Sequence, residues 1–80
     1  MEVMLYERAG CHLCEEVRVM LDDMVGPDRY LRIDVDDADD LVLRYGFRVP
    51  VIAIDGSDRL EAPMTADDVR ALLGSLERAG

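Results

Sequence analysis

The sequence predicts an α/β domain with the element order β-α-β-α-β-β-α, and three observations support this fold class. An apolar run at residues 3–6 leads into a helical pattern at residues 12–24. Residues 30–35 then alternate as a strand does, and the chain between the two strands is long enough for a right-handed parallel crossover. A hairpin signal at residues 55–58 joins two further strands, and a last helical pattern follows.

The first half of the chain contains a strand, a helix and a second strand. Residues 3–6 are apolar throughout, which is typical of a strand buried on both faces. The helix at residues 12–24 is predicted from one apolar stripe, formed by Leu13, Val17, Met20, Leu21 and Met24. Gly26 and Pro27 end this helix, and the alternating residues 30–35 form the next strand.

A short second helix is predicted after the acidic residues 36–40. Its apolar face consists of Leu41, Val42 and Tyr45. Gly46 follows this face, and we expect it to end the helix in the left-handed conformation that glycine adopts easily.

The second half of the chain predicts a hairpin and a last helix. The strand at residues 48–54 has Pro50 near its start, where a proline is tolerated. An Asp-Gly-Ser-Asp turn leads to a return strand at residues 59–62. Thr65 is the predicted N-cap of the last helix, with Asp68 completing a capping-box variant. The core stripe of this helix is Val69, Leu72, Leu73 and Leu76.

Composition limits the class of protein. The chain has 80 residues, half of them apolar, which is enough for one domain with a small core. Its net charge of −9 disfavours nucleic acid and anionic membrane surfaces as partners. No apolar run approaches the length of a membrane span, and the first residues lack the basic region of a signal peptide. We therefore expect a cytoplasmic protein.

The chain has two cysteines, Cys11 and Cys14, at the junction between the first strand and the first helix. A helix N-terminus carries partial positive charge and free N–H groups, and both stabilise a thiolate. A disulfide between these cysteines would close too small a loop to hold a secreted domain together. In a short βαβ pattern, this spacing indicates a redox-active dithiol.

This arrangement resembles the thioredoxin fold, and specifically the glutaredoxin-like proteins of bacteria. The resemblance runs across nearly the whole chain and depends mainly on two motifs, Cys11-x-x-Cys14 and Val49-Pro50. It implies one glutaredoxin-like domain over residues 1–80, built on a four-stranded mixed sheet with helices on both faces.

The resemblance also implies roles for individual residues. Cys11 would be the nucleophile and Cys14 the more buried resolving thiol. Pro50 would be a cis-proline facing the dithiol, and its loop would offer the backbone of Val49 to an extended substrate. Arg8 lies where glutaredoxins carry a basic residue that favours the thiolate and the substrate carboxylate.

His12 and Leu13 lie between the cysteines, where glutaredoxins usually carry Pro and Tyr, and we expect both to contact substrate. A protonated His12 would stabilise the thiolate of Cys11, whereas a neutral, exposed His12 would have little effect. The glycine pair that holds glutathione in glutaredoxins is absent from residues 61–67. The resemblance implies glutathione as a possible reductant, and because this glycine pair is absent, another low-molecular-weight thiol is a possible reductant as well.

The function expected from these features is thiol–disulfide exchange for cell redox homeostasis, with no bound cofactor beyond the redox-active disulfide. The expected substrate is a disulfide-containing protein or a small thiol compound. We expect the protein to be a monomer.

Two other classes of function remain open. The two cysteines of two chains could share a zinc ion or an iron–sulfur cluster, because one chain supplies too few ligands alone. The domain could instead bind partners without catalysis. In that case Cys11 would have the pKa of a free thiol, about 8.5. The acidic residues 34–40 do not fit a calcium-binding EF-hand. Its loop requires Gly at the sixth position and Glu at the twelfth, where this chain has Asp39 and Tyr45.

Overall fold

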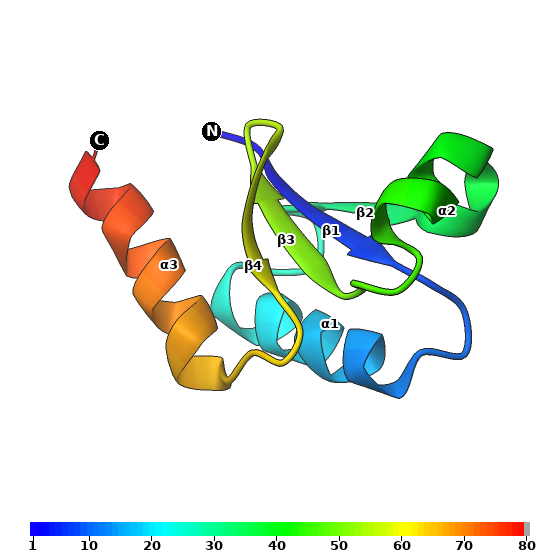
Figure 1. Ribbon diagram of the computed structural model, residues 1–80. Helices are drawn as coiled ribbons and strands as arrows, with labels where there is room; N and C mark the ends of the chain where they lie inside the picture. Colours follow the sequence, from blue (N-terminus) through cyan, green and yellow to red (C-terminus); the bar gives the residue numbers. More distant parts are fainter. Residues whose placement is uncertain (80) are drawn as a thin grey trace.

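The computed structural model describes residues 1–79 and contains four strands and three α-helices (Figure 1). The strands are β1 (Val3–Glu7), β2 (Leu31–Asp34), β3 (Val51–Ile54) and β4 (Ser57–Glu61). The helices are α1 (His12–Met24), α2 (Asp39–Tyr45) and α3 (Ala66–Ala79), and the 3-10 turn η1 (Val35–Asp37) precedes α2. The predicted element order is therefore confirmed.

The strands form one mixed sheet in the order β2-β1-β3-β4. β1 is parallel to β2 and antiparallel to β3, and β3 is antiparallel to β4. The parallel pair is joined through α1, as the length of the crossover predicts. This topology confirms the thioredoxin-like α/β fold.

Helices cover both faces of the sheet (Figure 1): α1 and α3 lie on one face and α2 on the other. The strands alternate between two cores. The core under α1 and α3 contains Val3, Leu5, Val17, Leu21, Tyr30, Ile52, Ile54, Val69 and Leu72. The core under α2 is smaller and contains Val35, Tyr45 and Val51, with Tyr6, Leu41 and Val49 packed against it.

A β-bulge in the β3–β4 hairpin directs side chains of β4 to opposite faces. Asp58 pairs with Ala53, and Leu60 pairs with Ile52, with a register shift between the two pairs. Regular alternation would place Asp58 and Leu60 on one face. With the bulge, Leu60 joins the core under α1 and α3, while Asp58 meets Tyr45 under α2.

Two predicted local signals are confirmed. Asp55 and Gly56 have positive φ angles of 50° and 85°, so they form the tight turn of the hairpin. The N–H of Asp68 donates to Thr65 Oγ1 at 3.1 Å, and the N–H of Thr65 donates to Asp68 Oδ2 at 2.9 Å. This reciprocal pair is the capping box at the start of α3.

The left-handed conformation predicted for Gly46 is wrong, because its φ is −53°. A Cβ at this position would lie 2.5 Å from the carbonyl oxygen of Val42 and 3.4 Å from a guanidinium nitrogen of Arg8. Glycine is therefore needed here for close approach rather than for its backbone freedom.

Candidate functional site

The cysteine pair lies at the N-terminus of α1. Cys11 is the N-cap residue of the helix, and its sulfur accepts a hydrogen bond from the N–H of Cys14 at 3.1 Å. The two residues form a disulfide, with their Cα atoms 5.2 Å apart. Cys14 is 1% exposed, whereas Cys11 is partly exposed.

This geometry gives the two sulfurs different chemical environments once the disulfide is reduced. The sulfur of Cys11 faces the free N–H groups and the positive end of the helix dipole, and both stabilise its thiolate. The sulfur of Cys14 lies inside the protein, where burial disfavours a thiolate. An incoming disulfide therefore has access to Cys11 first.

The loop before β3 supplies the second part of the site. The Val49–Pro50 peptide bond is cis, as the resemblance to glutaredoxins implied, and Pro50 is buried. A narrow groove of about 50 Å³ runs between α1, this loop and the segment before α3. It is lined by Leu13, Glu16, Val17, Met20, Pro50, Ala62, Pro63 and Met64. Leu13 and Pro50, both expected to contact substrate, thus line one groove.

The backbone of Val49 is only partly available. Its N–H donates to the carbonyl of Tyr45 at 3.0 Å, and the N–H of Arg48 donates to the same carbonyl at 2.8 Å. A substrate chain at this loop would therefore hydrogen-bond to the carbonyl of Val49 rather than to its N–H.

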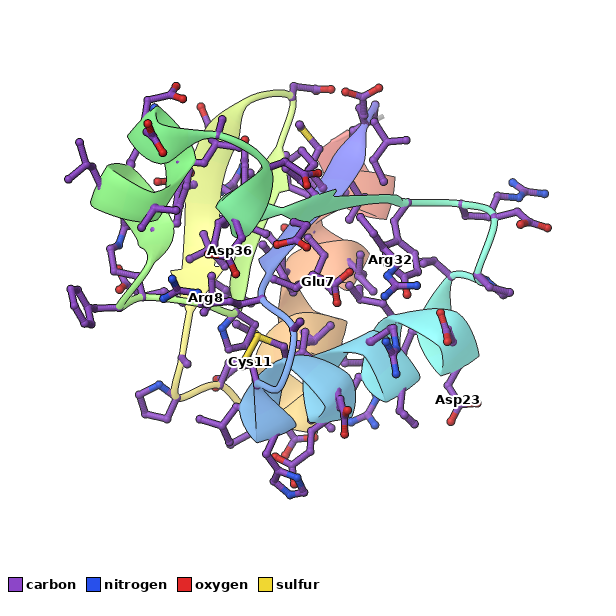
Figure 2. The ribbon with its side chains drawn as sticks, turned by 90° about the vertical axis from the view of Figure 1, so that its right-hand side faces the viewer. Glu7, Arg8, Cys11, Asp23, Arg32 and Asp36 are labelled. Carbon is purple, nitrogen blue, oxygen red and sulfur yellow. A yellow bond between two sulfur atoms is a disulfide. The ribbon has the colours of Figure 1, made fainter. Side chains whose placement is uncertain are left out.

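Arg8 lies between the cysteine loop and α2, and its guanidinium is held by acceptors on that side (Figure 2). It donates to Asp36 with Nε and Nη2 at 2.9–3.1 Å, and Nη1 donates to the carbonyl of Gly46 at 3.1 Å. These hydrogen bonds with Asp36 raise the pKa of Arg8. Arg8 thus links the cysteine loop to η1 and to the end of α2.

His12 points away from the protein interior. Its side chain is 84% exposed, and Nε2 lies 3.8 Å from Glu16 Oε1, one helical turn further along α1. The side chain of His12 is therefore accessible to a substrate, and its expected contact with substrate stays a prediction.

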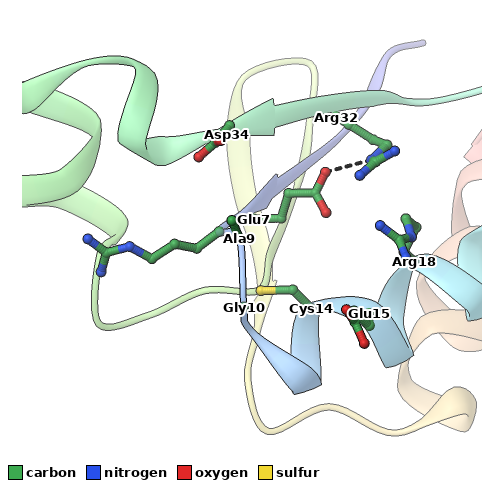
Figure 3. A pocket seen from close by; sticks show the side chains of 9 residues that line it. Glu7, Ala9, Gly10, Cys14, Glu15, Arg18, Arg32 and Asp34 are labelled. Atoms are coloured by element: carbon green, nitrogen blue, oxygen red, sulfur yellow. Dashed lines mark hydrogen bonds and ion pairs between the residues drawn. The ribbon is translucent and has the colours of Figure 1, made fainter.

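A wider cavity of about 290 Å³ adjoins the buried side of the disulfide (Figure 3). Its lining includes Cys14 and the charged residues Glu7, Glu15, Arg18 and Arg32. Arg32 Nε donates to Glu7 Oε2 at 2.6 Å, so the Glu7 carboxylate, which is 12% exposed, has a charged partner. Because Cys14 is buried, this cavity does not give a ligand ready access to a reactive sulfur.

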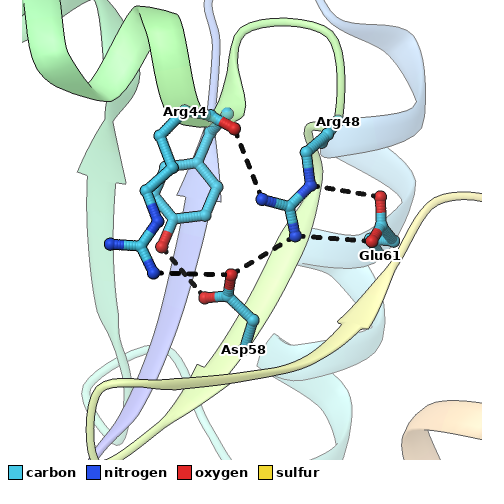
Figure 4. A network of polar contacts seen from close by, with 5 residues as sticks. Arg44, Arg48, Asp58 and Glu61 are labelled. Atoms are coloured by element: carbon cyan, nitrogen blue, oxygen red, sulfur yellow. Dashed lines mark hydrogen bonds and ion pairs between the residues drawn. The ribbon is translucent and has the colours of Figure 1, made fainter.

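A polar network holds the loop before β3 against β4 (Figure 4). Arg48 contacts Asp58 and Glu61, each at 3.3 Å, and it also donates to the carbonyl of Arg44. The hydroxyl of Tyr45 donates to Asp58 at 2.9 Å. The cis-proline loop is therefore positioned by charges on the neighbouring strand.

Several residues of the site escaped sequence reasoning. Asp36, the partner of Arg8, is one of several acidic residues to which the sequence assigns no role, and it lies 28 residues from Arg8 along the chain. Pro63 and Met64 complete the groove beside Pro50, and the Ala62–Pro63 bond is also cis. The one feature of the sequence that could have indicated Pro63 and Met64 is their position just before the last helix.

No group of three or more His, Cys, Asp or Glu side chains converges as a metal site would require within residues 1–79. In the same part of the chain, none of the helices has the length and apolar character of a membrane span.

A family model described as Glutaredoxin-like domain (DUF836) matches residues 2–74 of the chain. A comparison with the curated proteins finds no match.

Among solved structures, the chain is similar to the Northeast Structural Genomics target protein XcR50 from X. campestris. The X-ray structure is 32% identical over 91% of this chain and 96% of that chain, with a TM-score of 0.79. The solution structure is also 32% identical, over 94% of this chain and 95% of that chain, with a TM-score of 0.77. A structure titled as a malarial protein is 15% identical, covers 91% of this chain and 92% of that chain, and shares the fold with a TM-score of 0.53.

Proposed function

Because this chain belongs to the Glutaredoxin-like domain family, we propose that it is a thiol–disulfide oxidoreductase with Cys11 as nucleophile and Cys14 as resolving thiol. The observation that carries this proposal is the position of the disulfide: Cys11 caps α1 and is partly exposed, while Cys14 is buried one turn into the helix. We expect the substrate chain to lie against the cis-Pro50 loop, which lines a groove together with Leu13.

The proposed reaction starts from the reduced dithiol. The Cys11 thiolate attacks one sulfur of a substrate disulfide, so that a mixed disulfide forms and one substrate thiolate leaves. Cys14 then loses its proton and attacks the sulfur of Cys11. This step forms the Cys11–Cys14 disulfide and releases the second substrate thiolate. Two electrons pass from the dithiol to the substrate, and the two thiolates take up protons from solvent.

A thiol donor has to return the protein to its dithiol form after each turnover. We propose glutathione or another low-molecular-weight thiol for this role, acting by the reverse sequence of exchanges. The physiological setting would be the maintenance of reduced cysteines in the cytoplasm.

The test is a single-turnover assay in which the reduced protein is mixed with excess 2-hydroxyethyl disulfide. We expect the wild-type protein to be oxidised to the Cys11–Cys14 disulfide, and Cys11→Ser to lower the rate by at least about a hundredfold, to background. Cys14→Ser is the matched control, since it keeps the nucleophile. It should stop at a mixed disulfide on Cys11, which mass spectrometry detects.

Exchange that persists in Cys11→Ser would contradict the proposed mechanism. A wild-type protein that reacts no faster than Cys11→Ser would favour the non-catalytic binding domain instead.

A further inference from the structure

The most exposed apolar side chains of the described residues lie on α2 and the loop that follows it. Phe47, the single phenylalanine of the chain, is fully exposed at 104%, and Leu43 is 88% exposed. Leu43 lies in the last turn of α2, and Phe47 lies two residues beyond the end of that helix. Aromatic side chains are enriched at protein interfaces, so an exposed phenylalanine here is suited to contact a partner.

This apolar pair is connected to the redox site. Gly46, the residue before Phe47, accepts the hydrogen bond from Arg8 through its carbonyl, and Arg8 is three residues before Cys11. Phe47 is itself three residues before the cis-proline Pro50. The loop that carries Phe47 is therefore fixed to the loop that carries the nucleophile.

A second apolar surface begins between the cysteines. Leu13 is 49% exposed and lines the groove with Pro50 and Met64. The groove volume of about 50 Å³ is small, so it suits one apolar side chain rather than a whole cofactor or a tripeptide.

The charges around these surfaces favour a cationic ligand over an anionic one. Arg8 and Arg48, the arginines of the two site loops, already bind Asp36, Asp58 and Glu61. Glu15 and Glu16 are exposed on the first turns of α1. With a net charge of −9, the protein would repel a peptide rich in carboxylates and attract a basic one.

We infer that the substrate is a basic protein segment with an apolar side chain next to its disulfide-bonded cysteine. That side chain would enter the groove formed by Leu13, Pro50 and Met64, and Phe47 would pack against the partner outside the groove. This inference rests on the proposed function and specifies the substrate of the same site.

The probes are symmetrical disulfides of short peptides that differ in two respects. The residue after cysteine is Leu or Ser, and the flanking residues are Lys or Glu. Each is reacted in a single turnover with the reduced wild-type protein. We expect the Leu peptide to react about tenfold faster than the Ser peptide. The Lys peptide should also react about tenfold faster than the Glu peptide at low salt, and this advantage should shrink in about 0.5 M salt.

Variants then assign the apolar preference to the surface. Leu13→Ser should reduce the wild-type ratio of Leu-peptide to Ser-peptide rates at least threefold, because Leu13 lines the groove. Phe47→Ser should instead slow both peptides at least threefold and leave their ratio unchanged, because Phe47 lies outside the groove. Leu31→Ser is the matched control, because Leu31 is also 49% exposed but is the first residue of β2 and pairs with Met4, at the opposite end of β1 from the cysteines. It should leave the ratio and both rates unchanged.

Equal rates for the Leu and Ser peptides, or faster reaction of the Glu peptide, would overturn the inference. Equal effects of Phe47→Ser and Leu31→Ser would overturn it as well. In all of these cases 2-hydroxyethyl disulfide would still oxidise the wild-type protein in a Cys11-dependent reaction. If that reaction is absent, the proposed function itself has failed.

Discussion

Cys11 and Cys14 differ in burial and in their place on α1, and this difference is the basis of the proposed chemistry. Cys11 precedes the first turn and its sulfur faces backbone N–H groups, whereas Cys14 is 1% exposed. Their sequence spacing alone fits metal ligation as well as redox exchange. The distinction between an accessible and a protected sulfur requires the strand before the pair and the helix after it.

The hydrogen-bond partners of Arg8 could not be predicted from the sequence. The resemblance to glutaredoxins assigns Arg8 to the thiolate and the substrate, but the structure gives its donors to Asp36 and the carbonyl of Gly46. Asp36 is one of several acids that follow β2, and nothing in the sequence distinguishes it from its neighbours. The pairing depends on the turn η1, which brings residue 36 back toward the end of β1.

If Arg8 mainly positions the loops, removing either partner of the ion pair should have the same effect. We expect Arg8→Gln and Asp36→Asn each to lower the thermal melting temperature, because each leaves the other side chain without its partner. The pKa of Cys11, measured by thiolate absorbance, should change by a similar amount in the two variants.

A direct role of Arg8 at the thiolate would give a different result. Arg8→Gln would then raise the pKa of Cys11, whereas Asp36→Asn, which frees the guanidinium, would lower it.

At the scale of elements, the connection from α2 to β3 determines how the site is assembled. It contains Gly46 against Arg8, the exposed Phe47, the anchored Arg48 and the cis bond before Pro50. The sequence predicts the helix end and the proline, but it does not show that the carbonyl of Val42 leaves no room for a Cβ at Gly46, or that Arg8, which follows β1, lies against the same residue.

The close contact at Gly46 predicts whether Gly46→Ala raises or lowers the stability of the fold. Glycine to alanine at an unstrained helical φ usually stabilises a protein by about 0.4–1 kcal/mol. Here the new Cβ would lie 2.5 Å from the Val42 carbonyl oxygen, so Gly46→Ala should instead destabilise the fold by about 1–3 kcal/mol. Urea denaturation measures this difference, and a variant as stable as the wild type would contradict the assigned contact.

The hairpin shows which features of an element follow from local sequence. The Asp55-Gly56 turn and the Thr65–Asp68 capping box are confirmed because their signals lie within a few residues. The bulge between Asp58 and Leu60 is not evident in the sequence, because the residues that it directs to the two cores are not marked by any local signal. β4 begins at Ser57 rather than at the predicted residue 59, because the turn consists of Asp55 and Gly56 and Ser57 already pairs with Ile54.

At the scale of the whole molecule, the sheet separates two cores that each contain a buried tyrosine. Tyr30 donates to Asp22 at 2.5 Å in the core under α1 and α3, and Tyr45 donates to Asp58 under α2. Burial, followed by the hydrogen bond to a carboxylate, raises the pKa of Tyr30 and of Tyr45 to about 12.

These raised pKa values predict how stability depends on alkaline pH. A tyrosine in the unfolded chain loses its proton near its ordinary pKa of about 10, before the folded protein does. Between about pH 10 and 12 the folded state therefore holds more protons, and the free energy of unfolding should fall as pH rises. Below about pH 10 this contribution should be constant.

Urea denaturation at a series of alkaline pH values measures the effect, and Tyr30→Phe and Tyr45→Phe should each make the decline less steep. A decline as steep in both variants as in the wild-type protein would show that other groups cause it.

The central claim is that Cys11 is an activated nucleophile and that Cys14, because it is buried, does not react in its place. The most direct measurement is the rate of iodoacetamide alkylation of each cysteine in the reduced protein as a function of pH, resolved by mass spectrometry. We predict that Cys11 is alkylated preferentially at about pH 6, with a midpoint well below the free-thiol pKa of about 8.5, while Cys14 stays protected. A midpoint of about 8.5 for Cys11, or faster alkylation of Cys14, would contradict the claim.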